Sequence, residues 1–276
     1  MIEILKANEE FIKSTLEKTM NKISKTSDRV KDGMPYTTRD GLYDNWEDNA
    51  QWWTNTFWTG ILWLMYKETQ EEKYKLFADS IEDKMDAVLY GYDQLHHDVG
   101  FMWLLSSVMN FELTGNEKSR KRAMIAANVL FSRCNVEGGY IRAWNGDNEG
   151  LAIIDCMMNI PLLYWASKQT NDKRFNHIAN IHAKKSMTSF VRPDGSCNHM
   201  VVFDADTGEV VDNPKGGGYE SGSSWARGQS WAVYGYAQAY HWTQNLELSR
   251  SRQSLCPQPA HHSDSPGGGW HLDAQC

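Results

Sequence analysis

A turn that recurs four times limits the possible folds of this chain more than any other feature of its sequence. In each copy an amphipathic stretch runs into a threonine and a short polar segment, as in KETQEEKY and ELTGNEKS. The first two copies match the capping box T-x-x-E, which predicts that their threonines begin the next helix. Such a repeat of helical hairpins can close into a toroid or stack into a solenoid. The four threonines are Thr69, Thr114, Thr170 and Thr243.

Amphipathic helical periodicity extends over most of the chain, whereas the alternating pattern of strands is scarce. Two longer linkers, 134–150 and 192–223, are rich in glycine, asparagine and aspartate, and functional loops are expected there. The sequence therefore predicts an all-α domain of helical hairpins over residues 1–248. The helical stretches lie near residues 5–24, 54–69, 72–91, 99–114, 117–133, 150–169, 172–191 and 224–243.

From residue 249 onward the composition changes abruptly. Serine, proline, histidine and glycine replace the apolar periodicity, and the repeat stops in the middle of a hairpin. This composition is typical of a disordered or foreign segment. A flexible tail and a shifted reading frame both fit residues 249–276.

Charge and hydropathy argue against two classes of partner. The net charge of -7 and the pI near 5.7 leave no basic face for nucleic acid. No apolar run reaches the ~18 to 20 residues of a membrane span, and the charged amphipathic start differs from a signal peptide. The five cysteines are odd in number and form no CxxC pair, which indicates reduced thiols. We therefore expect a cytoplasmic protein without a membrane partner.

Asp98 is the first candidate for chemistry. It lies in LHHDVGFMW directly before an apolar helix, so its carboxylate can cap that helix, and a capping carboxylate can also be catalytic. The neighbouring His96 and His97 suggest a metal site. Adjacent histidine side chains diverge, however, and no further cluster has ligand spacing, so we expect no metal.

Asp155 interrupts GLAIIDCMMNIPLLYWA, a stretch of otherwise mostly apolar side chains. Burial of a carboxylate there is unfavourable without compensation. A hydrogen bond to a loop backbone is one explanation. Catalysis is the other, because burial raises the pKa of a carboxylic acid and lets it donate a proton near neutral pH. The catalytic interpretation predicts that Asp155 is shielded from solvent.

Arg227 lies near the start of a helix in SSWARGQSWAVYGY, where the helix dipole disfavours a cation. An acidic partner or a bidentate grip on an anionic ligand would explain the position, and a surface salt bridge is the alternative. Twelve tryptophans suggest stacking on sugar rings, although tryptophan also fills helical cores. Trp58 and Trp63, at helical spacing, are expected in the core. The candidates for ligand contact are Trp53, Trp144, His199, Trp225 and Trp231.

With these residues assembled, the chain resembles the unsaturated glucuronyl hydrolases of glycoside hydrolase family 88. The resemblance runs from about residue 44 to residue 243 and is carried by WTNTFWTGILWLMY, HHDVGFMW, IRAWNGDN, IIDCMMNIPLLYWAS and WARGQSWAVYGYAQAY in that order. It implies an (α/α)6 toroid of helical hairpins, here without the last hairpins. It also implies that Asp98 and Asp155 are catalytic. The implied substrate contacts are Trp53, Trp144, His199, Trp225, Arg227 and Trp231.

The implied substrate is a glycosaminoglycan-derived oligosaccharide whose non-reducing glucuronic acid carries a C4=C5 double bond. The resemblance implies that Asp155 donates a proton to C4 and activates the water that attacks C5, while Asp98 orients the ring hydroxyls. It implies no metal or organic cofactor. Two alternatives remain open: a related unsaturated rhamnogalacturonyl hydrolase, and an inactive remnant that binds sugar weakly. The sequence does not predict the oligomeric state.

Overall fold

The computed structural model describes residues 6–146, 148–246 and 248, and the chain divides into two compact units. The first unit comprises residues up to 92 together with 105–120, and the second comprises 93–104 and the residues from 121 onward. The predicted tail 249–276 lies outside the described residues. Among the helices of the described residues, none is long and apolar enough to cross a membrane.

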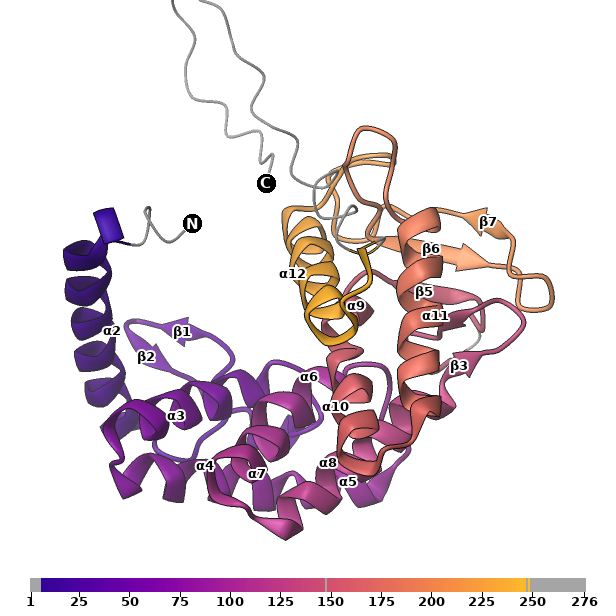
Figure 1. Ribbon diagram of the computed structural model, residues 1–276. Coiled ribbons are helices and arrows are strands. Elements are labelled where there is room, and N and C mark those ends of the chain that lie inside the picture. The colour runs from indigo at the N-terminus through magenta and orange to yellow at the C-terminus, as the bar shows by residue number, and fades with distance from the viewer. Residues whose placement is uncertain (1–5, 147, 247, 249–276) are drawn as a thin grey trace, which may run out of the picture. The chain divides into compact units, whose positions relative to one another are not determined.

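The first unit is built mainly from helices (Figure 1). Helices α3 and α4 form a hairpin, and Trp58 and Trp63 of α3 are 7% and 0% exposed, which confirms their predicted place in the core. The elements of this unit are α2 (Glu9–Val30), β1 (Thr38–Arg39), β2 (Leu42–Tyr43), η1 (Glu47–Asn49), α3 (Asn55–Thr69), α4 (Glu72–Lys84), α5 (Asp86–Gly91) and α7 (Met109–Thr114).

A buried carboxylate links several segments of the first unit. Glu82 of α4 is fully buried and accepts hydrogen bonds from the amide of Asn110 and from the hydroxyl groups of Ser107 and Ser119. Burial of a carboxylate is tolerated where such donors replace the lost water. This network therefore accounts for Glu82 as a structural residue.

The second unit carries the remaining elements. Helices α10 and α11 form a second hairpin, and β5, β6 and β7 form an antiparallel sheet (Figure 1). Strands β6 and β7 lie in the linker 192–223, where we expected a loop, and β5 lies at the start of the stretch 150–169, where we expected a helix. The elements are α6 (Val99–Trp103), β3 (Cys134–Asn135), β4 (Tyr140–Ile141), β5 (Leu151–Ile153), α9 (Cys156–Asn159), α10 (Pro161–Thr170), α11 (Lys173–Ser189), β6 (Met200–Phe203), β7 (Val210–Asp212) and α12 (Ala226–Thr243). Two further segments span both units: α8 (Glu117–Ser132) and the π-helical turn η2 (Leu104–Val108).

The recurring threonine turn is real, but its predicted role as a helix start is wrong. In all four copies the threonine is the last residue of a helix. Its hydroxyl donates to the carbonyl four residues earlier, at 2.7 to 2.8 Å, and accepts the N–H two residues later, at 3.2 to 3.3 Å. The residue after each threonine has a positive φ, as is common beyond a helix C-terminus. The four positive-φ residues are Gln70, Gly115, Asn171 and Gln244.

Helix α12 lies directly against α9, which brings the C-terminal motif to the segment that follows Asp155. The contact depends on Gly235, because a Cβ atom there would lie 2.4 Å from the Cβ of Met157. Helix α6 also packs on α9. Helix α9 is thus the element on which the candidate motifs of the second unit meet.

Candidate active site

Asp98 and Asp155 occupy the same local position on two packed helices. Asp98 directly precedes α6, Asp155 directly precedes α9, and neither side chain makes a capping hydrogen bond. The capping explanation for Asp98 is therefore not supported. The two helices approach closely at Gly100, where a Cβ atom would lie 2.4 Å from the Cα of Asn159.

Asp98 is the more buried of the two aspartates. Its carboxylate Oδ1 lies 3.2 Å from Nε2 of His97, and Oδ2 lies 3.5 Å from Nδ1 of His96. Burial, followed by the charge of Asp155, raises the pKa of Asp98 to about 7. A hydrogen bond from Asn159 acts in the opposite direction. Asp98 therefore retains a proton over much of the pH range below neutrality.

The two histidines beside Asp98 are held neutral. Burial lowers the pKa of His96 to about 4 and that of His97 well below its usual value. Contrary to our expectation, both rings turn toward the carboxylate, and the three residues offer ligand atoms within 4.8 Å of one another. This spacing is compatible with a cation. The 3.2 Å separation between Nε2 of His97 and Oδ1 of Asp98 is also within hydrogen-bonding distance.

Asp155 is more accessible than we expected. Its side chain is 14% exposed, against 9% for Asp98, so the solvent shielding that we expected for Asp155 is incomplete. Oδ1 of Asp155 lies 3.5 Å from Nε2 of His199. Because Nδ1 of His199 accepts the backbone N–H of Gly217 at 2.7 Å, we assign the ring proton to Nε2, which faces Asp155.

Aromatic side chains and one arginine extend from this histidine. The ring of Trp225 lies 4.2 Å from that of His199, and the guanidinium of Arg227 lies 4.1 Å above the Trp225 ring. The predicted candidates His199, Trp225 and Arg227 therefore form one cluster. Trp231 packs against Phe101 of α6, with the ring centres 5.3 Å apart.

Trp144 is connected to the Asp98 segment through the backbone. The carbonyl of Ala143 accepts the N–H of His97 at 3.0 Å and a hydrogen bond from the guanidinium of Arg133 at 2.9 Å. Arg133 also donates to the side chain of Asn145, so it fixes the chain on both sides of Trp144. The indole of Trp144 is 43% exposed and can meet a ligand.

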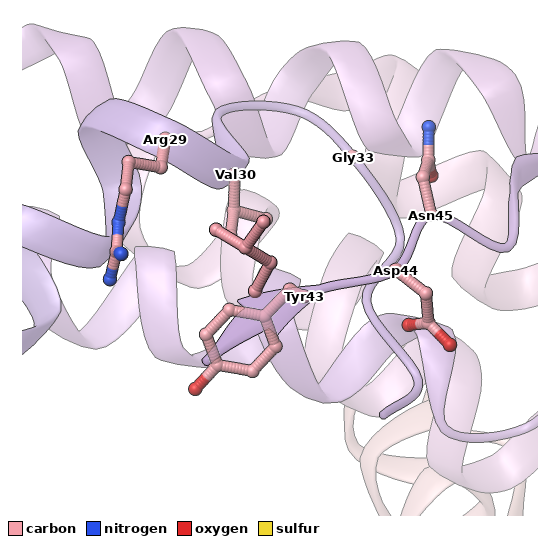
Figure 2. Close-up of a pocket in the computed structure, with 7 residues that line it drawn as sticks. Arg29, Val30, Gly33, Tyr43, Asp44 and Asn45 are labelled. Carbon is pink, nitrogen blue, oxygen red and sulfur yellow. The ribbon is translucent and has the colours of Figure 1, made fainter. Parts of the chain in front are cut away.

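Trp53 belongs to the first unit, where its ring packs edge-on against Phe57 at 5.6 Å. Its predicted contact with substrate stays a prediction. The same unit holds a cavity of about 310 Å³ between the end of α2 and β2, lined by residues that include Arg29, Tyr43 and Asp44 (Figure 2). None of the predicted site residues lines this cavity.

Our reading of the sequence missed Asn159, Gly100 and Arg133. Asn159 carried a usable signal, since it lies four residues after Asp155 in the same apolar stretch and therefore on the same face of a helix. Gly100 and Arg133 carried none, because their roles depend on a close helix contact and on backbone carbonyls of another segment.

A family model described as Glycosyl Hydrolase Family 88 matches residues 23–256. The chain belongs to this family. The family 88 relatives include the unsaturated glucuronyl hydrolase of Bacillus sp. (strain GL1), 38% identical over 213 residues that make up 75% of this chain and 56% of the relative. The unsaturated chondroitin disaccharide hydrolase of Streptococcus pyogenes serotype M1 is 35% identical over 246 residues, which are 87% of this chain and 61% of the relative.

The crystal structure of the unsaturated glucuronyl hydrolase from Bacillus sp. GL1 superposes on this chain with a TM-score of 0.80 and 32% identity. The match covers 86% of this chain and 64% of that one. The predicted fold class, helical hairpins of the α/α type, is confirmed by this similarity. The chain spans about three fifths of the length of the curated relatives it matches.

Proposed function

We propose that this chain hydrates the C4=C5 double bond of the unsaturated glucuronic acid at the non-reducing end of a glycosaminoglycan-derived oligosaccharide, and thereby releases the neighbouring sugar. The observation that carries the proposal is the pair of aspartates at the starts of the packed helices α6 and α9, in a chain of family 88. Relatives named as unsaturated glucuronyl and chondroitin disaccharide hydrolases support the same substrate class.

In this proposal Asp155 performs the proton transfers. Its carboxyl group donates a proton to C4 of the enol ether while positive charge develops at C5 and the ring oxygen. The resulting carboxylate takes a proton from the water that attacks C5, so the side chain returns to its starting state and water has been added across the double bond. The hemiketal at C5 then opens to a ketone by breaking the bond between C5 and the ring oxygen, which leaves a hemiacetal at C1. This hemiacetal collapses to an aldehyde, its hydroxyl proton passes to the glycosidic oxygen, and the neighbouring sugar is released. The accessibility of Asp155 and the Nε2–H of His199 beside it support this role.

Asp98 has the complementary role. Because its pKa is raised to about 7, it can donate a hydrogen bond to a ring hydroxyl at neutral pH, which an ionised carboxylate cannot do. A neutral Asp98 also avoids placing a second negative charge beside an anionic substrate. We propose that Asp98 orients the sugar and that His96 and His97 keep it in place.

The uronic acid carboxylate requires a cation, and Arg227 supplies one. Its guanidinium carbon lies 4.1 Å from the centre of the Trp225 ring, and this cation–π contact holds the fork in position for a bidentate contact with a carboxylate. Trp144, Trp225 and Trp231 offer apolar faces for sugar rings. Trp53 is a proposed contact that rests on the resemblance alone.

The test is a turnover assay with an unsaturated chondroitin disaccharide, followed by the ultraviolet absorbance of the conjugated double bond. We expect the absorbance to disappear with the wild-type chain, and to persist with Asp155→Asn and with an unsaturated rhamnogalacturonan disaccharide. Persistent absorbance with wild-type protein that has a cooperative unfolding transition would contradict the proposal and favour a sugar-binding remnant.

A cytoplasmic location is also a proposal. It is supported by the three cysteines within the described residues, Cys134, Cys156 and Cys197, all of which are free. Cell fractionation of the source organism would test it, and recovery of the protein from the extracellular fraction would contradict it.

A further inference from the structure

We propose that Asn159 is a positioning residue that fixes the carboxyl group of Asp98 relative to Asp155. The inference rests on the proposed function, in which these two aspartates share one substrate. Asn159 is the last residue of α9 and is fully buried, so its amide has no access to substrate or bulk water. Its contribution must therefore pass through the groups that it contacts.

The two ends of the Asn159 side chain bind different parts of the candidate site. Its Oδ1 accepts the backbone N–H of Phe101 at 2.7 Å, which ties it to the first turn of α6. Its Nδ2 lies 3.5 Å from Oδ1 of Asp98 and 3.4 Å from the backbone carbonyl of Asp155. One amide thus connects the starts of both helices.

The close approach of the helices makes this bridge specific. A Cβ atom at Gly100 would lie 2.4 Å from the Cα and 2.5 Å from the carbonyl oxygen of Asn159, so α6 packs directly on the backbone of residue 159. A longer side chain has no room to move away from α6. A shorter one cannot span the distance from α9 to Asp98.

The charge of Asp98 depends on the same contact. An amide donor stabilises the ionised carboxylate, so the hydrogen bond from Asn159 holds the pKa of Asp98 lower than burial alone would. Removal of the donor is therefore expected to raise the pKa of Asp98 above about 7. The other titratable or charged groups that act on or lie beside Asp98 are His96, His97, Arg133, Asp155, Cys156 and Arg227.

Two variants separate the donor from the packing. Asn159→Asp keeps an oxygen that can accept from Phe101 and removes the amide donor. Asn159→Ser adds no charge and replaces the amide with a hydroxyl group that is too short to reach Asp98. Titration of the Asp98 carboxyl carbon by NMR, with its signal identified by its loss in Asp98→Asn, should show a midpoint about one pH unit higher in both variants. The value of kcat/KM at pH 7 should fall about tenfold or more.

Asn135→Asp is the matched control. The side chain of Asn135 also accepts a backbone N–H, from Gly138, and donates to a backbone carbonyl, that of Ala205. It lies in the same unit, and its side-chain hydrogen bonds with Tyr140, Ala205 and Gly138 involve neither aspartate. We expect its substitution to leave the Asp98 midpoint and kcat/KM within twofold of wild type.

The outcomes distinguish the two proposals. An active wild type whose Asp98 midpoint and kcat/KM are unchanged in both folded Asn159 variants would overturn the positioning role and leave the proposed function intact. If the wild type shows no turnover but the Asp98 midpoint is raised in the Asn159 variants, the result would support the positioning role and contradict the proposed function. If Asn159→Asp fails to fold, Asn159→Ser alone decides, because the NMR midpoint needs no activity.

Discussion

The segments that begin α6 and α9 place an aspartate at the same local position and give it different surroundings. Asp98 faces two neutral imidazoles and is almost wholly buried, whereas Asp155 faces a single histidine and is partly open to solvent. Neither carboxylate caps its helix. The difference shows that the exposure of each aspartate is determined by the segment that folds over it, since the helix start itself is alike in both.

The covering segments explain the contrast. Over Asp98 they come from the preceding residues, because the N–H of His97 is held by the carbonyl of Ala143 and its ring lies beside the carboxylate. Over Asp155 the cover comes from a distant loop, through His199 and the backbone of Gly217. The local cover leaves the side chain of Asp98 9% exposed, and the loop cover leaves that of Asp155 14% exposed.

The largest expected effect is the loss of turnover in Asp155→Asn. If Asp155 carries the proton transfers, removing them should lower kcat by about a thousandfold or more, as is typical of a general acid or base. The circular dichroism spectrum and the urea midpoint should change little, since the side chain makes no capping bond and is partly exposed. Retention of kcat within tenfold would assign the proton transfers to another group.

Asp98→Asn should change the pH dependence of stability. The pKa of Asp98 is raised from 3.8 to about 7 on folding, so its stabilising contribution is complete below about pH 4 and is lost as the pH rises through 7. Between about pH 5 and pH 8 the free energy of unfolding of wild type should fall by roughly 2 to 3 kcal/mol relative to Asp98→Asn. Urea unfolding of both proteins at both pH values measures this.

A difference between the two proteins that is constant with pH would contradict the raised pKa of Asp98. Other titrating groups do not obscure the result, because they are common to both chains. The same urea unfolding comparison between wild type and Asp155→Asn tests one cause of the raised pKa. Removing the charge of Asp155 should lower the pKa of Asp98.

Sequence patterns predicted the helical hairpins, whereas the choice of a toroid and the assignment of Asp98 and Asp155 as catalytic came from the resemblance. The four threonine turns predicted hairpins, even though each hydroxyl ends a helix instead of beginning one. Asp155 stood out because it is charged in an apolar stretch. The motifs around Trp144, His199 and Arg227 identified residues that the second unit brings into contact with one another or with the segments of the two aspartates.

The relative burial of the two aspartates could not be predicted, for a physical reason. An apolar sequence neighbourhood indicated that Asp155 is buried, but exposure depends on tertiary cover, and the loop around Gly217 leaves part of Asp155 accessible. Asp98 is covered by its sequence neighbours His96 and His97. The sequence did not predict this cover, because the side chains of adjacent histidines were expected to diverge. The role of Gly100 depends on a contact between residues far apart in sequence.

Gly100→Ala should disturb both segments at once and have an intermediate effect. The added methyl group would meet the backbone of Asn159, which cannot rotate away, so the helices must separate. We expect a loss of about 1 to 3 kcal/mol in the free energy of unfolding and a fall in kcat/KM of about tenfold. Gly91→Ala is the matched control, because a Cβ atom on Gly91 of α5 meets nothing within 4 Å and should leave stability unchanged or slightly higher.

The smallest effect is expected for His199→Gln. The Nε2 of His199 lies 3.5 Å from Oδ1 of Asp155, and this oxygen has no hydrogen-bond partner among the described residues. The contribution of His199 therefore arises when bound substrate tightens the contact. A glutamine amide can supply the same N–H from a similar distance. We therefore expect kcat/KM to fall by about tenfold, with most of the change in kcat. A loss as large as that of Asp155→Asn would mean that His199 itself takes part in proton transfer. The surroundings of Asp98 and Asp155 would then differ in more than accessibility.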